Sequence, residues 1–235
     1  MQLFYTPGVS GDEYIFEPEE ARHLLWVLRK KIGDQVHHTD GFGNLFHSVI
    51  IDDRDKNCMV RINKVEREYG KRNFHLCIAI APTKNTARLE WFVEKATEIG
   101  IDRIIPFFGE HSERRNLNND RLEKVIISAM KQSVKAYKPI LEKAVDFENL
   151  VKQGYSGQKF FGWMGDGNSM SLGKGYKPGS DVCILIGPEG DFSHNEVQIA
   201  QEHGFVPINL GNSRLRTETA AIVACSWINL LNQTE

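Results

Sequence analysis

A buried-strand pattern that runs straight into a glycine-bounded loop and a helix start is the strongest constraint on the fold of this 235-residue chain. The apolar run Val182–Ile186 precedes Gly187-Pro188-Glu189-Gly190, and Ser193 followed by Glu196 has the spacing of a helical capping box. Tight loops between buried strands and helices are typical of α/β proteins with a parallel sheet, whose ligands bind beyond the carboxyl ends of the strands. We therefore expect an α/β domain with a ligand-binding loop at 187–190.

The loop by itself does not identify the ligand. It lacks the G-x-G-x-x-G pattern of dinucleotide-binding loops and the Gly-Lys-Ser/Thr of phosphate-binding loops. An ordinary turn between a strand and a helix has the same local pattern, so the function has to be argued from other segments.

The C-terminal two thirds of the chain alternate between strand-like and helix-like patterns. Strands are expected at His75–Ala81, Asp102–Phe108, Lys159–Met164, Asp181–Ile186 and Phe205–Leu210. Amphipathic helices are expected at Asn85–Ile99 and Asp120–Ala136, and an almost wholly apolar one at Glu218–Leu231. The alternation predicts a parallel sheet with right-handed crossovers. The apolar helix is expected in a core or in an oligomer interface.

The N-terminal region reads as mostly β. A helix is expected at Glu17–Lys31, with Gly33 as its stop, followed by strands at Gln35–Thr39, Leu45–Asp52 and Cys58–Glu66. Short strands at this spacing indicate a small barrel. A polar segment at 69–73 is a natural boundary, which gives two expected domains, 1–70 and 71–235.

Two arginines flank the start of the apolar helix. Arg214 and Arg216 precede Thr217, an expected N-cap, and Glu218, whose charge suits the positive end of a helix. Cations at a site that is already positive indicate an anionic ligand or a developing negative charge. The alternative is that they pair with Glu218 or Glu189, and Glu189 could instead accept hydrogen bonds from loop N–H groups.

Composition limits the kinds of partner. The net charge is −2, so contact with nucleic acid would have to come from local patches, such as 111–143, where basic residues outnumber acidic ones. A solvated helix face is the alternative there. The four cysteines are expected to be buried hydrophobes, and no metal site is expected. Neither a signal peptide nor a membrane span is expected, which favours the cytoplasm.

The segments Leu185–Glu196 and Leu210–Ala221 together resemble the SPOUT-class methyltransferases, and more narrowly the RsmE family, which methylates N3 of a uridine in 16S ribosomal RNA. The likeness spans nearly the whole chain, since 22–29, Lys95–Gly100 and Gln132-Ser133 before Pro139 also resemble elements of that family. Three places depart from its pattern, and at the first of them Lys131 stands where a glutamate is common. Asp191 stands where a second glycine is common, and Asn212-Ser213-Arg214 where many members read Pro-Arg-Ile.

The resemblance implies a C-terminal SPOUT trefoil-knot domain, an N-terminal PUA-like β-barrel that binds RNA, and a homodimer that acts on 16S rRNA in the 30S subunit. It implies S-adenosylmethionine as cofactor, held by Leu185, Ile186, Gly187, Glu189, Gly190, Leu210, Gly211 and Leu215. Arg216 is expected to stabilise the uracil anion, with Glu218 to orient it or take the proton. RNA phosphates are expected at Arg22, Arg29, Lys30, Arg114, Arg115 and Lys135.

Two other functions remain open from the sequence. The same fold could methylate a ribose 2′-oxygen or another base, because the cofactor loops would look much the same. A non-catalytic RNA-binding factor for ribosome assembly is the second alternative, and the intact loops and Arg216 count against it. A small-molecule methyltransferase would not need the N-terminal barrel.

Overall fold

The computed structural model describes residues 1–54, 57–165 and 169–233, which form two compact units. The first comprises Met1–Lys71 with Ile127–Lys138, and the second Arg72–Ile126 with Pro139 onward. The first unit is therefore not the contiguous stretch 1–70, because residues at and beyond the end of helix α3 (Asn119–Gln132) pack with the N-terminal strands. Both the Thr39 hydroxyl (3.1 Å) and the Gly43 N–H (2.9 Å) donate to the Ala136 carbonyl.

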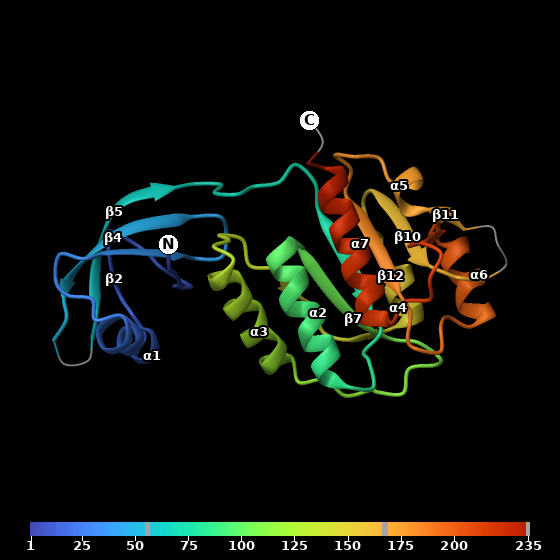
Figure 1. Cartoon of the computed structure of the whole chain (residues 1–235), viewed down its shortest axis with the longest axis horizontal. Coiled ribbons are helices and arrows are strands. Elements are labelled where there is room, and N and C mark those ends of the chain that lie inside the picture. Colours follow the sequence, from blue (N-terminus) through green and yellow to red (C-terminus); the bar gives the residue numbers. More distant parts are fainter. Residues whose placement is uncertain (55–56, 166–168, 234–235) are drawn as a thin grey trace. The chain divides into compact units, whose positions relative to one another are not determined.

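The first unit is built on a five-stranded sheet of order β1-β3-β4-β5-β2 (Figure 1). Its strands are β1 (Leu3–Tyr5), β2 (Glu13–Ile15), β3 (Gln35–Thr39), β4 (Leu45–Asp52) and β5 (Met59–Glu66). β1 runs parallel to β3 and the other pairs are antiparallel. The three strands expected here are confirmed, the third starting one residue late, whereas β1 and β2 were not anticipated.

The helix expected at Glu17–Lys31 is too long. The structure has α1 (Pro18–Arg22) followed by a π-helical turn, η1 (His23–Val27), which the Leu28 N–H closes on the His23 carbonyl at 3.0 Å. The chain reverses at Arg29, whose φ is +56°, so Gly33 is not the stop. The apolar periodicity continues past the point where the backbone leaves the helix, and periodicity alone could not locate this end.

The second unit holds an eight-stranded sheet in which every described pair is parallel, in the order β11-β13-β10-β12-β6-β7-β8 with β9 beside β7. Its strands are β6 (Leu76–Ile80), β7 (Arg103–Phe108), β8 (Ile140–Leu141), β9 (Val145–Asp146), β10 (Gln158–Gly162), β11 (Met170–Ser171), β12 (Val182–Ile186) and β13 (Val206–Asn209). The expected α/β fold with a parallel sheet is confirmed. The two-residue strands are too short for any periodic signal.

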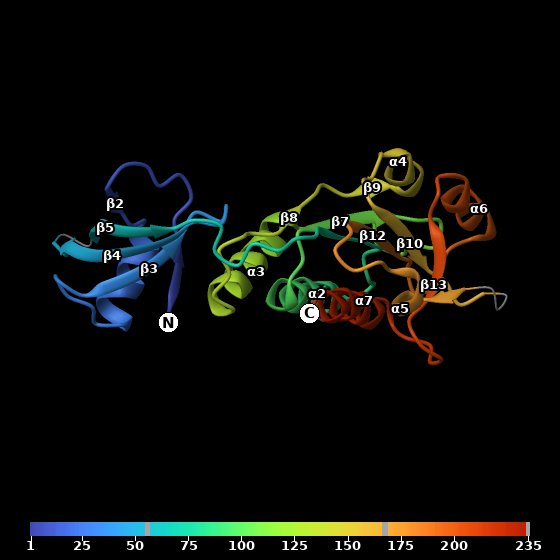
Figure 2. The same ribbon diagram turned by 90° about the horizontal axis from the view of Figure 1, so that it is seen from above.

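Helices cover both faces of this sheet. They are α2 (Thr86–Ile99), α4 (Phe147–Lys152), α5 (Leu172–Gly175), α6 (His194–Glu202) and α7 (Thr217–Leu231). In Figure 2, α2, α5 and α7 lie along one face and α4 and α6 along the other. Side chains alternate accordingly along β6: Leu76, Ile78 and Ile80 pack in one core, Cys77 and Ala79 in the second.

The local signals for these helices are mostly borne out. Asn85 caps α2, its side-chain oxygen accepting the Ala87 N–H at 3.0 Å, and Ser193 with Glu196 forms the expected capping box of α6. The helix expected to reach Ala136 ends instead at Gln132, where Val134 follows with a φ of +56°. Within the described residues, none of the helices is both long and apolar enough to cross a membrane.

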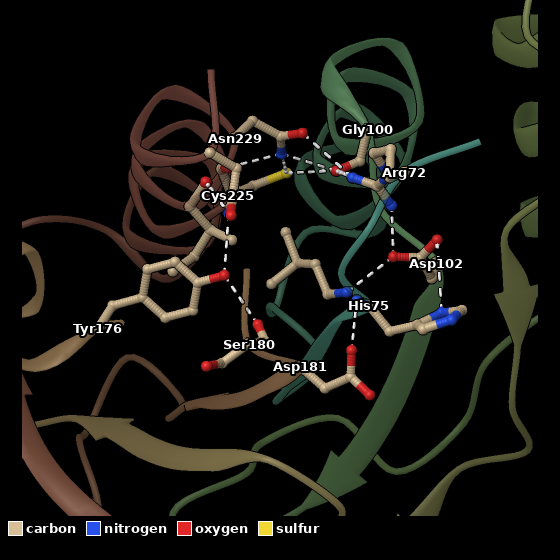
Figure 3. Close-up of polar contacts among 12 residues, drawn as sticks. Arg72, His75, Gly100, Asp102, Tyr176, Ser180, Asp181, Cys225 and Asn229 are labelled. Carbon is tan, nitrogen blue, oxygen red and sulfur yellow. Dashed lines mark hydrogen bonds and ion pairs between the residues drawn. The ribbon is translucent and has the colours of Figure 1, made fainter. Parts of the chain in front are cut away.

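A polar network fixes the C-terminal half of α7 at the amino end of β6 (Figure 3). The Arg72 guanidinium donates to the Gly100 carbonyl (2.9 Å) and the Asn229 side-chain oxygen (3.1 Å), and it pairs with Asp102. Asp102 also accepts the Leu76 N–H at 2.7 Å. The strands of this sheet run in the same direction, so their carboxyl ends lie opposite this network. The start of α7 is therefore held at the carboxyl ends of the strands.

Candidate functional site

A cavity of about 580 Å³ lies at the carboxyl ends of β10, β12 and β13. Three loops line it together with the first turn of α7. The lining residues are Gly162, Trp163, Met164, Gly165, Ile186, Gly187, Pro188, Glu189, Asp191, Ile208, Asn209, Leu210, Gly211, Ser213, Arg214, Leu215, Arg216, Thr217 and Ala220. Its size and its place in the sheet are those of a small-molecule site.

The first wall is the loop after β12. A side chain on Gly187 would put its Cβ 3.0 Å from the ring of Phe192, closer than most Cβ contacts, so the ring would have to move to accept it. Glu189 Oε1 accepts the Lys84 backbone N–H at 3.1 Å, so the alternative role of Glu189 as a structural acceptor is confirmed. Asp191 adopts a φ of +63°, a conformation that glycine takes most easily, and this agrees with the glycine common at this position in the resembling family.

The Asp191 carboxyl sits in an unusual environment for an acid. Burial raises its pKa above the ordinary value, while the Phe192 N–H, at 2.8 Å, and the positive charge of Arg214 act in the opposite direction. The Asp191 carbonyl also contacts the His111 ring nitrogen at 2.9 Å, which joins the loop after β7 to this wall.

The second wall is the loop between β13 and α7. Gly211 has a φ of +118° with open space around it, so backbone conformation rather than crowding requires glycine here. No N–H from Gly211 to Leu215 donates a hydrogen bond to any described residue. This wall therefore offers the cavity a row of unused backbone donors.

The third wall, Gly162 to Gly165 after β10, was missed from the sequence. The Trp163 N–H donates to the Ile208 carbonyl at 3.0 Å, which carries the loop over the end of the neighbouring β13. The sequence does hold a signal for this wall. The segment covers the end of the strand expected at Lys159–Met164, which in the structure ends at Gly162, and it holds two glycines, but only the strand order reveals that β10 lies between β12 and β13.

The start of α7 differs from the expectation in one respect. Arg216, not Thr217, is the N-cap residue, and the Thr217 hydroxyl donates to the Gly187 carbonyl at 3.1 Å. The predicted cap is wrong because Thr217 is buried between the two loops, where a hydroxyl finds its acceptor in the facing backbone rather than in its own helix. The contact ties the first wall to the second.

The two predicted catalytic residues lie on different sides of this helix end. Arg216 is exposed and lines the cavity, and neither it nor Arg214 forms an ion pair with a described residue. Glu218 is 6% exposed and faces Arg88 instead, 3.7 Å from its Nε, in a separate small pocket with Trp91. Its Oε2 is buried without a hydrogen-bond partner among the described residues.

Six of the eight predicted cofactor residues line the cavity: Ile186, Gly187, Glu189, Leu210, Gly211 and Leu215. Leu185 does not, because its alternate position along β12 turns it into the second core. Gly190 does not either, and lies against His111, whose Cβ would be 3.0 Å from an added side chain.

The predicted RNA-binding residues fall in both units. Arg114 and Arg115 lie on the loop after β7, where Arg114 Nε donates to the Lys84 carbonyl (3.3 Å) and Arg115 lies 3.9 Å from Asp146. Arg22, Arg29 and Lys30 belong to the first unit, as does Lys135.

The cavity thus combines apolar walls, unpaired backbone donors and two cationic side chains. This suits a flat heteroaromatic ligand that accepts hydrogen bonds from the backbone, beside a reacting group that acquires negative charge. Within the described part of the chain, no group of three or more potential metal ligands occurs.

Known proteins resemble the chain over most of its length. A family model described as an RNA methyltransferase domain matches residues 70–229. The ribosomal RNA small subunit methyltransferase E of Rickettsia conorii is 31% identical over 90% of this chain and 86% of its own.

Solved structures agree with this likeness. A Porphyromonas gingivalis protein described as an rRNA methyltransferase superposes with a TM-score of 0.93 at 40% identity, over 99% of this chain and 98% of its own. A Legionella pneumophila methyltransferase solved with the cofactor SAM bound gives a TM-score of 0.84 at 29% identity, over 97% and 96%.

Proposed function

The chain belongs to the ribosomal RNA small subunit methyltransferase E family, within the RNA methyltransferase domain class, and from this we propose that it methylates N3 of a uridine in 16S ribosomal RNA. The observation that carries the proposal is the cavity at the ends of β10, β12 and β13, with Arg216 exposed at its rim. Relatives named for small-subunit rRNA support the substrate class.

The cofactor is S-adenosylmethionine, and the cavity fits it. The free N–H groups of Gly211–Leu215 suit the ring nitrogens of adenine, which are acceptors only, and Ile186, Leu210 and Leu215 supply apolar contact for its faces. The left-handed turn at Gly211 lets the backbone come close to a ligand. When bound, the cofactor supplies an electrophilic methyl group on a sulfonium.

The low reactivity of uracil N3 determines what the protein has to supply. N3 carries a proton in neutral uridine and is a poor nucleophile until that proton leaves, whereupon negative charge spreads over O2 and O4. We assign Arg216 to this charge, because a guanidinium that no carboxylate neutralises is free to stabilise it. N3 lies on the Watson–Crick edge, so the target base has to be unpaired or flipped out to reach the rim.

Glu218 is assigned a positioning role in place of direct proton transfer. Its carboxylate faces Arg88 of α2 and is not part of the cavity lining, and it lies in the first turn of α7, where negative charge stabilises the helix start. Because Arg216 is the N-cap of the same helix, holding this turn also holds Arg216.

The remaining features follow the family. We propose that the connection 210–216, which runs from β13 past the end of β12 to α7, threads a trefoil knot, and the Thr217 contact with Gly187 supports this crossing. The first unit is proposed to be a PUA-like RNA-binding domain, and Leu185 and Gly190 to support the cofactor loops from behind. Arg114, Arg115 and Lys135 are proposed to contact RNA.

A homodimer in the cytoplasm completes the proposal. Leu230 on α7 is 57% exposed and Trp91 on α2 is 43% exposed, so the outer side of this helix pair offers apolar surface for a second copy. Sedimentation velocity of the pure protein tests the dimer, and a monomer at micromolar concentration would refute it.

The test of function is transfer of labelled methyl from S-adenosylmethionine to 30S particles that lack the modification, followed by nucleoside analysis. We expect label in 3-methyluridine. Arg216→Ala should abolish most of the transfer, on the order of 100-fold or more, as for other residues that stabilise a reacting anion. Its cofactor affinity should remain, while Arg103→Ala, at the start of β7 and paired with Glu142 away from the cavity, serves as the control and should leave transfer unchanged.

Each other outcome has a distinct meaning. Label in a different nucleoside would keep the methyltransferase and refute N3 of uridine as its target. Cofactor binding without transfer to any rRNA particle would refute the rRNA substrate. If the protein bound no cofactor, the non-catalytic RNA-binding alternative would replace the enzyme.

A further inference from the structure

The first unit exposes a tryptophan on its π-helical turn. Trp26 is 70% exposed and Val27 beside it 65%, whereas Ala21 and Leu24 of the same segment are fully buried. The buried residues anchor the turn in the core of the unit, so the outward position of Trp26 is fixed by packing. Single exposed apolar residues are common, and exposure alone carries no function.

The charges around Trp26 supply the second observation. Arg22, Arg29, Lys30 and Lys31 flank it within ten residues of sequence, and none forms an ion pair with any described residue. Five other cations of this unit form ion pairs. The pairs are Arg54–Asp52, Arg61–Glu13, Lys64–Glu66, Lys71–Glu68 and Lys131–Glu20. Trp26, the single tryptophan of this unit, thus lies in a stretch of sequence whose four cations have no ion pair with a described residue.

The backbone at this point is also held in an unusual shape. The Lys30 N–H donates to the Leu24 carbonyl at 3.0 Å, and Arg29 occupies the left-handed position that closes such a helix end, which glycine normally takes. An arginine there costs about 1 kcal/mol relative to glycine. Arg29 follows the same turn as Trp26, and its side chain is exposed too.

We propose that Trp26 is a stacking platform for an unpaired base of the RNA substrate, with Arg22, Arg29 and Lys30 holding the adjacent phosphates. An indole flanked in sequence by four unpaired cations matches a single strand, whose unstacked bases present their faces beside a charged backbone. A duplex buries its base faces and is read through phosphates and ribose hydroxyls, so it would leave Trp26 without a partner.

A second copy of the chain is the weaker candidate for this surface. A symmetric contact through Trp26 would bring the two sets of unpaired cations together, and like charges oppose such a contact. The proposal rests on the proposed function for its choice of RNA, and it adds a substrate-binding site in the first unit that acts through stacking as well as charge.

The experiment measures binding of the full-length protein to a labelled single-stranded RNA 10-mer and to the blunt-ended duplex of that 10-mer with its complement. Trp26→Ala should weaken single-strand binding roughly 5- to 100-fold and leave duplex binding nearly unchanged, and Trp26→Phe should retain most of the affinity. The salt dependence should stay the same in Trp26→Ala, whereas Arg22→Ala should lower its slope by about one.

Ile15→Ala is the matched control, since Ile15 is 53% exposed in the same unit but lies among acidic residues. This variant should bind RNA like the unmodified protein. All the variants should have the melting temperature and the cofactor affinity of the unmodified protein. In methyl transfer to 30S particles, Trp26→Ala should raise KM and leave kcat unchanged.

Failure of this proposal can be told apart from failure of the proposed function. Unchanged single-strand binding in Trp26→Ala, with methyl transfer intact, would overturn the stacking site alone. A change in sedimentation without a change in RNA binding would assign the surface to a second copy and also overturn it. Loss of single-strand affinity in Trp26→Ala would support the site even if the particle assay detected no methyl transfer.

Discussion

A buried histidine should make the first unit sensitive to mild acid. His38 on β3 is fully buried, contacts the Thr6 hydroxyl (2.7 Å) and the Ser48 hydroxyl (2.8 Å), and stacks on Phe46 with the rings 4.9 Å apart. Burial lowers its pKa from 6.5 to about 4, the charge of His37 acts in the same direction, and Asp40 acts weakly against them.

The sign and size of the effect follow from linkage. Because the folded-state pKa is depressed, the unfolded state binds the extra proton, so stability is fully present above pH 6.5 and is lost as the pH falls toward 4. A difference of 2.5 units, 6.5 minus 4, corresponds to roughly 3 kcal/mol of unfolding free energy. This is a large part of the stability of a small domain.

Hydrogen exchange of the β3 and β4 amides, corrected for intrinsic rates, measures this free energy in the intact chain. Between pH 6.5 and 4.5 the unmodified protein should lose about 1.4 kcal/mol per pH unit more than His38→Gln, which keeps polar groups but cannot be protonated. Carboxylates titrate in both proteins and cancel in the comparison. Equal slopes in the two proteins would show that His38 is not held neutral by burial, and the reasoning would be wrong.

Three further predictions concern the second unit. Arg72→Met removes the positive charge that pairs with Asp102 and the donor to the Gly100 carbonyl, so the free energy of unfolding should fall by about 1.5–3 kcal/mol in urea titrations. Cofactor affinity should stay unchanged, because this network lies at the end of the sheet opposite the cavity. Weakened cofactor binding would contradict this reasoning. Gly211→Ala should cost about 1–2 kcal/mol through its φ of +118° and weaken cofactor binding in calorimetry, whereas an unaffected affinity would exclude this loop from the site. Asp191→Asn should raise the melting temperature at pH 7, because burial raises the pKa of Asp191 and its ionised form opposes folding; the gain should vanish in acid as the native carboxyl is protonated, and a constant gain would rule out this cause.

Signals carried by neighbouring residues were sufficient to predict much of the cavity lining. The Ser193–Glu196 capping box and the glycines of 187–190 depend on local backbone geometry, so the sequence alone located the first wall. The second wall followed from the loop before the apolar helix. Residues 162–165 could not be located in this way, because their part in the cavity depends on the order of strands in the sheet, which adjacency along the chain does not determine.

The partners of the side chains at the start of α7 could not be predicted from the sequence for a similar reason. Thr217 has the composition and position of an N-cap, but the carbonyl of Gly187 on a loop 30 residues away takes its hydroxyl. Glu218 is in the expected helix turn, and the packing of α7 against α2 turns it toward Arg88. In both cases the residue was identified correctly as lying at the helix start, and the facing element decided what its side chain does.

The loop that carries Gly211 and Arg216 can keep unused donors because both of its ends are fixed. β13 is hydrogen-bonded to β10 and β11 on its two sides, and α7 is anchored at its far end through Asn229, whose side-chain nitrogen donates to the Gly100 carbonyl at 2.8 Å. A free loop would satisfy its own N–H groups with turns. Both ends of this loop are held by other elements, and its N–H groups from Gly211 to Leu215 have no protein acceptor among the described residues.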